Sequence, residues 1–145
     1  MSNASATLRL TLFPRLSELT RVRTELDRYL RDGSLPDTAR NMLLVVAEEI
    51  LINIVRYGCC DETSDKIEVK VDQENAEVHM EFIDSGKPFN PLNVAGRAIA
   101  GQLVDDQELG GFGVPLVRGL TNYQEYTRKA DRNHFRITKH VLSPK

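Results

Sequence analysis

The sequence predicts an α+β domain in which a mixed, mostly antiparallel sheet carries helices on one face. Two observations lead to this fold class. Segments that alternate polar and apolar residues, as strands do, outnumber the segments with apolar residues at helical spacing. Four of the five expected strands follow one another as hairpins, which disfavours an all-parallel sheet.

The expected elements follow the order β-α-α-β-β-loop-α-β-β. The segment "TLRLTLF" alternates as a strand, and the next segment begins with Pro14, ends at Gly33 and has leucines at helical spacing. We expect strands at residues 7–13, 66–72, 76–84, 123–130 and 133–142 and helices at 14–33 and 35–58. Residues 110–120 turn from glycines into a third helix. Residues 85–109 are irregular, and a loop of this length in a compact domain is usually functional.

Length and composition indicate one ordinary globular domain over residues 1–145, of which 1–4 are expected to be an expression-tag remnant. Apolar residues make up 41% and charged residues 28%, and the net charge of −2 gives no reason to expect direct contact with nucleic acid or a membrane surface. There is no signal-peptide pattern and no apolar run of about 18 residues. The adjacent Cys59 and Cys60 would form a strained disulfide, so we expect reduced thiols in a cytoplasmic protein.

The second helix carries a polar row on an otherwise apolar surface. From Met42 to Val55 it is apolar almost all round, which predicts burial. Glu49, Asn53 and Arg56 are spaced i, i+4 and i+7 and would share one face. They could form a solvated helix edge with a loose Glu49–Arg56 pair. Alternatively, a carboxylate and an amide one turn apart could present oxygens to Mg²⁺ or to a reacting hydroxyl.

An aspartate ends the second strand of the first expected hairpin. Asp84 is followed closely by Gly86 in "FIDSGKPFNP". Such an aspartate could accept a hydrogen bond from an exocyclic amine, while the glycine lets a flat ring approach the backbone. The simpler interpretation is a plain Asp-Ser-Gly turn.

Three glycines precede the third expected helix. Gly110, Gly111 and Gly113 stand in "ELGGFGVPLV", and free N–H groups at a helix N-terminus can bind phosphate. The segment is neither a Walker A loop, since no Gly-Lys-Ser/Thr follows, nor a Rossmann fingerprint, since no strand leads into it. A tight turn is the alternative.

Taken together and in order, these motifs resemble the GHKL ATPase superfamily, which includes gyrase, Hsp90, histidine kinases and MutL. Within it, the chain is similar to the small anti-sigma-factor serine kinases of the RsbW type. The resemblance covers nearly the whole chain, and "DSGKPFNP", "GGFGVPLVRGL" and "RNHFRITK" carry it. It implies a two-layer α/β sandwich of the GHKL (Bergerat) type.

The resemblance also implies roles for individual residues. Asn53 matches the family's Mg²⁺-coordinating asparagine, and Glu49 matches the acidic residue that takes the proton from the substrate serine. Asp84 matches the aspartate that binds adenine, with Gly86 beside the ring.

Further positions match the phosphate and lid segments of the family. These are the phosphate loop at Gly110, Gly111 and Gly113 and the ATP lid at residues 87–109. Apart from the resemblance, Phe112 could pack on the lid or on the ligand, and plain packing is the alternative. Two positions depart from the pattern. Arg56, an expected phosphate contact, stands where some members have His or Lys, and His134 is close to the place of an adenine-side threonine.

The resemblance implies an anti-sigma factor that is also a serine/threonine protein kinase using ATP and Mg²⁺ and releasing ADP. It would bind a sigma factor and phosphorylate a small anti-anti-sigma protein of the STAS type, with the first helix facing the partner, and relatives suggest a homodimer. The alternative is a nucleotide-responsive binding module, an anti-sigma clamp without significant kinase activity. A plain ATPase is a third possibility.

Overall fold

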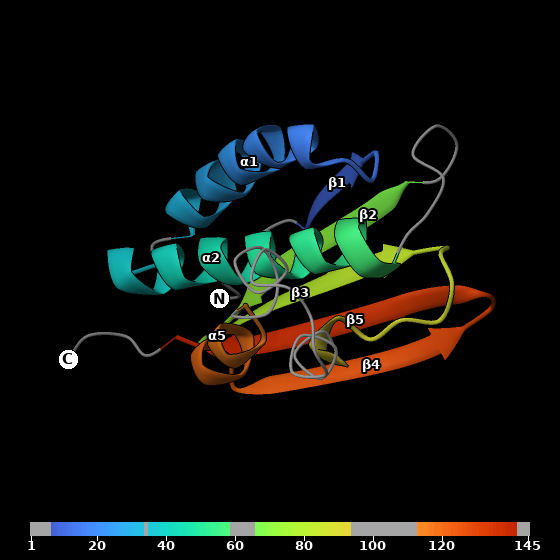
Figure 1. Ribbon diagram of the computed structural model, residues 1–145. Coiled ribbons are helices and arrows are strands. Elements are labelled where there is room, and N and C mark those ends of the chain that lie inside the picture. Colours follow the sequence, from blue (N-terminus) through green and yellow to red (C-terminus); the bar gives the residue numbers. More distant parts are fainter. Residues whose placement is uncertain (1–6, 34, 59–65, 94–112, 142–145) are drawn as a thin grey trace.

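A computed structural model describes residues 7–33, 35–58, 66–93 and 113–141, and Figure 1 shows them in two layers. One layer is an antiparallel five-stranded sheet with the strand order β1-β2-β3-β5-β4. The strands are β1 (Leu8–Leu12), β2 (Ile67–Glu74), β3 (Glu77–Asp84), β4 (Tyr123–Lys129) and β5 (Arg132–His140). The other layer consists of α1 (Leu19–Asp32), α2 (Asp37–Asn53) and α5 (Gly113–Leu120). The predicted fold class, with helices on one face of the sheet, is confirmed; the pairings of the described strands are all antiparallel, so the sheet is not mixed.

The inner face of the sheet is apolar because every second residue of a strand points toward the helices. On β2, Ile67, Val69 and Val71 are fully buried. The antiparallel register places Val69 opposite Phe82 and Val71 opposite Met80, and both partners on β3 are also fully buried. These cross-strand pairs form the part of the hydrophobic core that the sheet contributes.

The helices complete the core from above. Val22, Leu26 and Leu30 recur every four residues on α1 and are buried, which gives that helix one apolar face. Helix α2 lies between α1 and α5 and over the sheet, so it buries residues on several sides. The buried guanidinium of Arg40 fastens α1 to α2, since its Nε lies 3.1 Å from Asp27 and its Nη1 lies 2.8 Å from Asp37.

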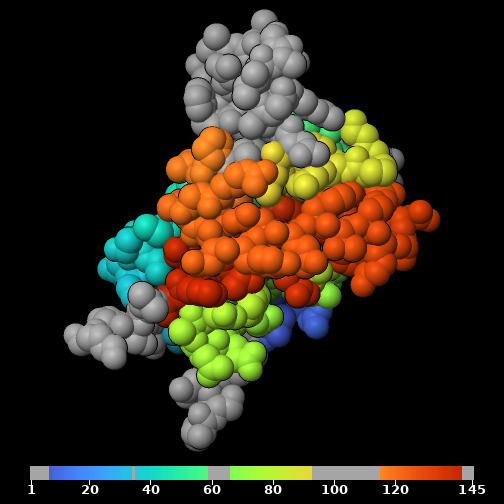
Figure 2. Space-filling view, turned by 90° about the horizontal axis from the view of Figure 1, so that it is seen from below, coloured from blue at the N-terminus to red at the C-terminus, as the bar shows by residue number. Residues whose placement is uncertain are grey.

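The opposite face of the sheet is polar. Seen from that side, β4 and β5 form much of the surface (Figure 2). The outward residues of β4, including Glu125, Thr127 and Lys129, are exposed, and Arg136 on β5 is exposed as well. None of the helices in the described part of the chain is long and apolar enough to span a membrane.

The second helix differs from its prediction at the C-terminal end. The expected α-helix over residues 35–58 is α-helical only to Asn53, and the chain continues as a π-helical turn, Ile54–Gly58. Such wide turns are frequent at functional sites. Gly58 is buried against Phe89, and a Cβ placed on Gly58 would lie 2.2 Å from Cδ2 of that ring. The last residue of this turn is therefore at a position against the Phe89 ring where no side chain fits. The first helix differs less: it begins with a 3₁₀ turn, Leu16–Glu18.

Gly58→Ala tests this close approach. The added methyl group forces the Phe89 ring out of its packed position, so the free energy of unfolding should fall by about 1–3 kcal/mol, as in other overpacked cores. Urea denaturation measures this. Gly119→Ala in α5 is the control, because a Cβ there meets no atom within 4 Å and alanine favours a helix by up to about 1 kcal/mol. Equal stability of the two variants would contradict the packing described.

Candidate functional site

Polar side chains gather where the C-terminal end of α2 meets the end of β3 and the start of β5. Figure 1 shows these ends together at the right of the molecule. Glu49 and Asn53 lie one turn apart on α2, and Asp84 is the last residue of β3. Asn133 lies directly opposite Asp84 on β5. Of these four, Asn53, Asp84 and Asn133 are at most 2% exposed.

Asn53 has a buried oxygen that lacks a donor. Its Nδ2 donates to the carbonyl oxygen of Pro91 at 3.3 Å, in a 3₁₀ turn, Pro91–Asn93. That bond fixes which side of the amide carries the oxygen. Within residues 7–33, 35–58, 66–93 and 113–141, no group donates to Oδ1. Leaving a buried acceptor unpaired costs about 1–3 kcal/mol, and an amide oxygen is a hard ligand suited to Mg²⁺. The residue therefore fits a cation supplied with a ligand.

Glu49 carries a half-buried carboxylate. It forms no hydrogen bond or ion pair with any residue that the structure describes. Burial raises the pKa of Glu49 above its ordinary value, and the neighbouring charge of Glu48 raises it further. Glu48 itself lies 3.4 Å from Arg23 of α1. An unpaired carboxylate with a raised pKa is a better proton acceptor than an ordinary one.

Asp84 has a buried carboxylate, and one of its two oxygens accepts hydrogen bonds from the protein. Its Oδ1 accepts hydrogen bonds from the backbone N–H of Gly86 and from Nδ2 of Asn133, both at 2.9 Å. Burial raises its pKa, while the bonds from Asn133 and Gly86 and the charges of Arg128 and Arg132 act in the opposite direction. No described residue donates to Oδ2, so this oxygen can accept a hydrogen bond from a ligand.

Asn133 was not anticipated by the sequence, which drew attention to the neighbouring His134 instead. The structure turns His134 to the opposite face of the sheet, where its Nδ1 lies 3.2 Å from Glu81. The signal was present in the alternation of β5. Asn133 has the same parity as the buried Phe135 and Ile137, and therefore shares their inward face.

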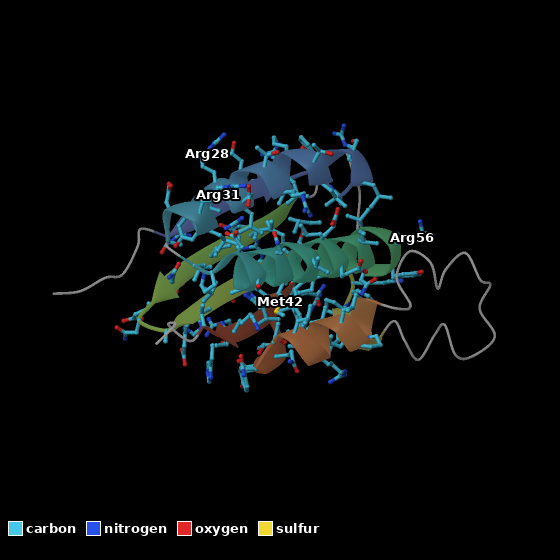
Figure 3. The ribbon with its side chains drawn as sticks, turned by 90° about the vertical axis from the view of Figure 1, so that its left-hand side faces the viewer. Arg28, Arg31, Met42 and Arg56 are labelled. Carbon is cyan, nitrogen blue, oxygen red and sulfur yellow. The ribbon has the colours of Figure 1, made fainter. Side chains whose placement is uncertain are left out.

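Arg56 follows the point at which the α-helical part of α2 ends, at Asn53. It lies in the π-helical turn, is exposed, and projects outward beyond the end of α2 (Figure 3). Its guanidinium carbon lies 5.9 Å from the centroid of the Tyr57 ring. The i, i+4 and i+7 spacing assumes α-helical geometry, which ends at Asn53, and the expected contact of Arg56 with phosphate stays a prediction.

The expected phosphate segment is only partly described. Gly110, Gly111 and Phe112 lie outside the described residues, as do residues 94–109 of the expected lid. Gly113 begins α5, which contacts α2 and the Pro91–Asn93 turn. Helix α5 follows the expected phosphate loop, and the Pro91–Asn93 turn belongs to the expected lid. The structure therefore places these two segments in contact with each other.

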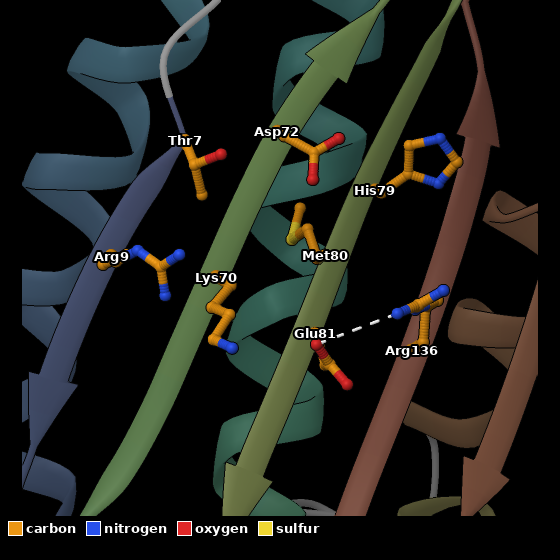
Figure 4. Close-up of a pocket in the computed structure, with 8 residues that line it drawn as sticks. All are labelled: Thr7, Arg9, Lys70, Asp72, His79, Met80, Glu81 and Arg136. Atoms are coloured by element: carbon orange, nitrogen blue, oxygen red, sulfur yellow. Dashed lines mark ion pairs between the residues drawn. The ribbon is translucent and has the colours of Figure 1, made fainter.

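A hollow lies on the open face of the sheet. Its lining is drawn in Figure 4 and consists of Thr7, Arg9, Lys70, Asp72, His79, Met80, Glu81 and Arg136. Cations and carboxylates are mixed there, and Glu81 lies 3.9 Å from Arg136. The buried acceptors of Asn53 and Asp84 have no counterpart among these residues. The end of α2 is therefore the stronger candidate for a ligand site.

Three comparisons with known proteins agree on the kind of domain. Residues 13–139 match the model of the family described as "Histidine kinase-like ATPase domain". The chain is 30% identical over 101 residues to the serine/threonine-protein kinase BtrW of Bordetella bronchiseptica, covering 70% of each chain. It also resembles the crystal structure of the RsbU and RsbW domains of Rv1364c from Mycobacterium tuberculosis, with a TM-score of 0.69 and 17% identity. That match covers 97% of this chain but 34% of the solved one, and at this identity it shows the fold alone.

Asp84→Asn should reveal what the buried charge costs. The amide oxygen of the variant can still accept from Gly86 and Asn133, while the charge is removed. An acid whose pKa is raised by folding binds its proton more tightly in the folded chain. The wild type therefore loses stability as the pH rises from about 4 through that raised pKa.

We accordingly expect Asp84→Asn to be the more stable protein at pH 7, with a difference that shrinks toward pH 4. Chemical denaturation of both proteins between pH 4 and pH 8 measures this. The stability of the variant minus that of the wild type should be larger at pH 7 than at pH 4. A smaller difference at pH 7 would contradict the account of Asp84.

Proposed function

We propose that this chain, which belongs to the family of histidine kinase-like ATPase domains, binds ATP at the end of α2 and transfers its terminal phosphoryl group to a protein serine or threonine. The observation that carries the proposal is the buried Oδ1 of Asn53, which lacks a donor among the described residues and lies on the helix that also holds the unpaired Glu49. The name of the curated relative, a serine/threonine-protein kinase, supports the same reaction.

Each residue of the site has a task in this reaction. Asp84 accepts a hydrogen bond from the amine of the adenine ring through Oδ2, and Gly86 leaves room for the ring. Asn53 offers Oδ1 to the metal ion. Bound Mg²⁺ would neutralise charge on the phosphates as the phosphoryl group is transferred. Glu49 takes the proton of the substrate hydroxyl while that oxygen bonds to phosphorus, and the bond to the ADP leaving group breaks.

We further propose the partners that the motif resemblance implies: a sigma factor, and a small STAS-type antagonist as phosphate acceptor. The outer surface of α1 supports a docking role. Arg28 pairs with Glu25 at 3.0 Å, and this arginine is exposed on the outer side of the helix (Figure 3). Exposed pairs of this kind contribute at most about 1 kcal/mol to stability, so a partner can replace them at low cost.

Asn53→Ala should remove the metal-dependent part of nucleotide binding. In calorimetric titrations, the wild type should bind ATP more tightly with Mg²⁺ than with a chelator. In the variant the two affinities should become nearly equal, because the oxygen offered to the metal is gone. Wild-type protein that is folded and binds no ATP would refute the proposed function. Wild-type affinity that is independent of Mg²⁺ would refute the role of Asn53.

Glu49→Gln tests phosphate transfer. It keeps the size of the side chain but removes the proton acceptor, so transfer to an antagonist protein should fall by about 10²- to 10⁴-fold while ATP affinity changes little. Radiolabelled ATP measures the transfer. Glu48→Gln is the matched control, because that carboxylate pairs with Arg23 instead of lying unpaired, and transfer should stay within a few-fold of the wild type.

Equal transfer by the wild type and Glu49→Gln would show that Glu49 is not the base. If the wild type transfers no phosphate but still holds a sigma factor in a nucleotide-dependent way, the protein is a binding module and the kinase proposal fails.

A further inference from the structure

We infer that Asn133 is a positioning residue for base recognition: its side-chain amide sets the direction of the Asp84 carboxylate and ties it to the backbone of residues 86–89. The inference rests on the proposed function, because it concerns how Asp84 recognises the amine of an adenine ring. It assigns a task to a residue for which the sequence analysis named no role.

Both amide hydrogens of Asn133 are used on the strand end and the segment that follows it. Nδ2 donates to Oδ1 of Asp84 at 2.9 Å and to the carbonyl oxygen of Lys87 at 2.8 Å. A hydroxyl side chain has one hydrogen to donate and could serve only one of these acceptors. A carboxylate has none and would place a second negative charge beside Asp84. An amide is therefore the group that can satisfy both.

The oxygen of the same amide is also fully engaged. Oδ1 of Asn133 accepts from the backbone N–H of Phe89 at 3.1 Å, from Nη1 of Arg128 at 3.2 Å, and from the hydroxyl of Tyr126. Arg128 in turn donates to the carbonyl oxygen of Gly86 at 2.7 Å. Donors on one side and acceptors on the other leave the amide a single orientation. The NH₂ group must face Asp84.

The register of the last hairpin puts Asn133 in this position. The β4–β5 turn is formed by Ala130 and Asp131, both with positive φ, as expected for a two-residue hairpin turn. Asn133 therefore lies between Arg128 on β4 and Asp84 on β3. A shift of one residue would turn it to the open face of the sheet.

The consequence for recognition follows from the two oxygens of Asp84. Oδ1 is occupied by the donors from Gly86 and Asn133, so Oδ2 is the oxygen left for a ligand. Without Asn133, only the backbone N–H of Gly86 holds the carboxylate, and the group can rotate. An amine on the ligand then loses a fixed acceptor. A ligand without that amine loses nothing, because it never used the acceptor.

The comparison of ADP with inosine diphosphate isolates this effect, because inosine has a carbonyl oxygen where adenosine has the amine. Calorimetry with each nucleotide and Mg²⁺ should give the wild type a preference for ADP of about 10- to 100-fold, the usual worth of a hydrogen bond to a charged group. In Asn133→Asp the preference should fall at least about fivefold, mainly because ADP binds less tightly. Asn133→Ala, which adds no charge, should show the same loss of preference.

Asn122→Asp is the matched control. It makes the same chemical change near the other end of β5, where Oδ1 of Asn122 accepts from the backbone N–H of His140 at 2.7 Å, a bond that a carboxylate preserves. Its preference for ADP should equal that of the wild type. Circular dichroism and thermal unfolding without nucleotide establish that each variant is folded, and Asn133→Ala decides the question if Asn133→Asp does not fold.

The possible results distinguish a failure of the positioning role of Asn133 from a failure of the proposed function. If the folded wild type binds neither nucleotide, both the positioning role of Asn133 and the proposed function are overturned. Wild type that prefers ADP, with an unchanged preference in the folded Asn133 variants, overturns the positioning role and leaves the proposed function intact. An equal weakening of both nucleotides in these variants also overturns it, since it would mark Asn133 as a general support of the fold.

Discussion

The burial of the Asp84 carboxylate at the end of β3 constrains much of the structure around it. A buried charge is costly unless hydrogen bonds compensate it. Two donors do so here, the backbone N–H of Gly86 and the amide of Asn133. The first requires the chain to turn immediately after β3. The second requires β5 to lie beside β3 in one register only.

These requirements extend to the helix layer. After the turn at Gly86, the chain passes Phe89, whose ring packs against Gly58 at the end of the π-helical turn. It then reaches Pro91, whose carbonyl oxygen holds the amide of Asn53. The segment from Asp84 to Pro91 thus connects the acceptor on the sheet with the acceptor on α2. Gly58, at the end of the π-helical turn, has no side chain and leaves the space that the Phe89 ring occupies.

The same residues lower the stability of the fold when no ligand is bound. The pKa of Asp84 and that of Glu49 are raised mainly by burial, and Asn53 keeps a buried oxygen without a donor among the described residues. By contrast, Arg40 is buried with two carboxylates that satisfy it. Buried polar groups are satisfied at Arg40, whereas Asn53 at the end of α2 keeps an acceptor without a donor among the described residues. Local conflicts of this kind are expected at functional sites.

Much of this arrangement can be predicted from the sequence. Alternation identifies the strands, and the spacing of Glu49 and Asn53 predicts their shared helical face. Asp84 and Gly86 are predicted as a pair at a strand end, and the structure places them there. Helical periodicity continues through Gly58 and gives no sign of the π-helical turn or of the close approach of Gly58 to Phe89, a residue distant in the sequence.

The contact from the last hairpin was also missed, for a different physical reason. His134 and Asn133 are adjacent, and a difference of one residue in a strand selects the opposite face of the sheet. Only the core-facing parity of Phe135 and Ile137 distinguishes the two. Pairings across strands, such as Asp84 with Asn133, depend on register, which a motif within one segment does not contain.

The most direct test of the central claim is a nuclear magnetic resonance titration of the wild type with ADP and Mg²⁺. The claim is that nucleotide binds between the end of α2 and the end of β3. It predicts shifts of the side-chain amide of Asn53 and of the backbone amide of Gly86, with the side-chain amide of Asn122 unchanged. Shifts confined to the open face of the sheet, around Lys70 and Arg136, would contradict it.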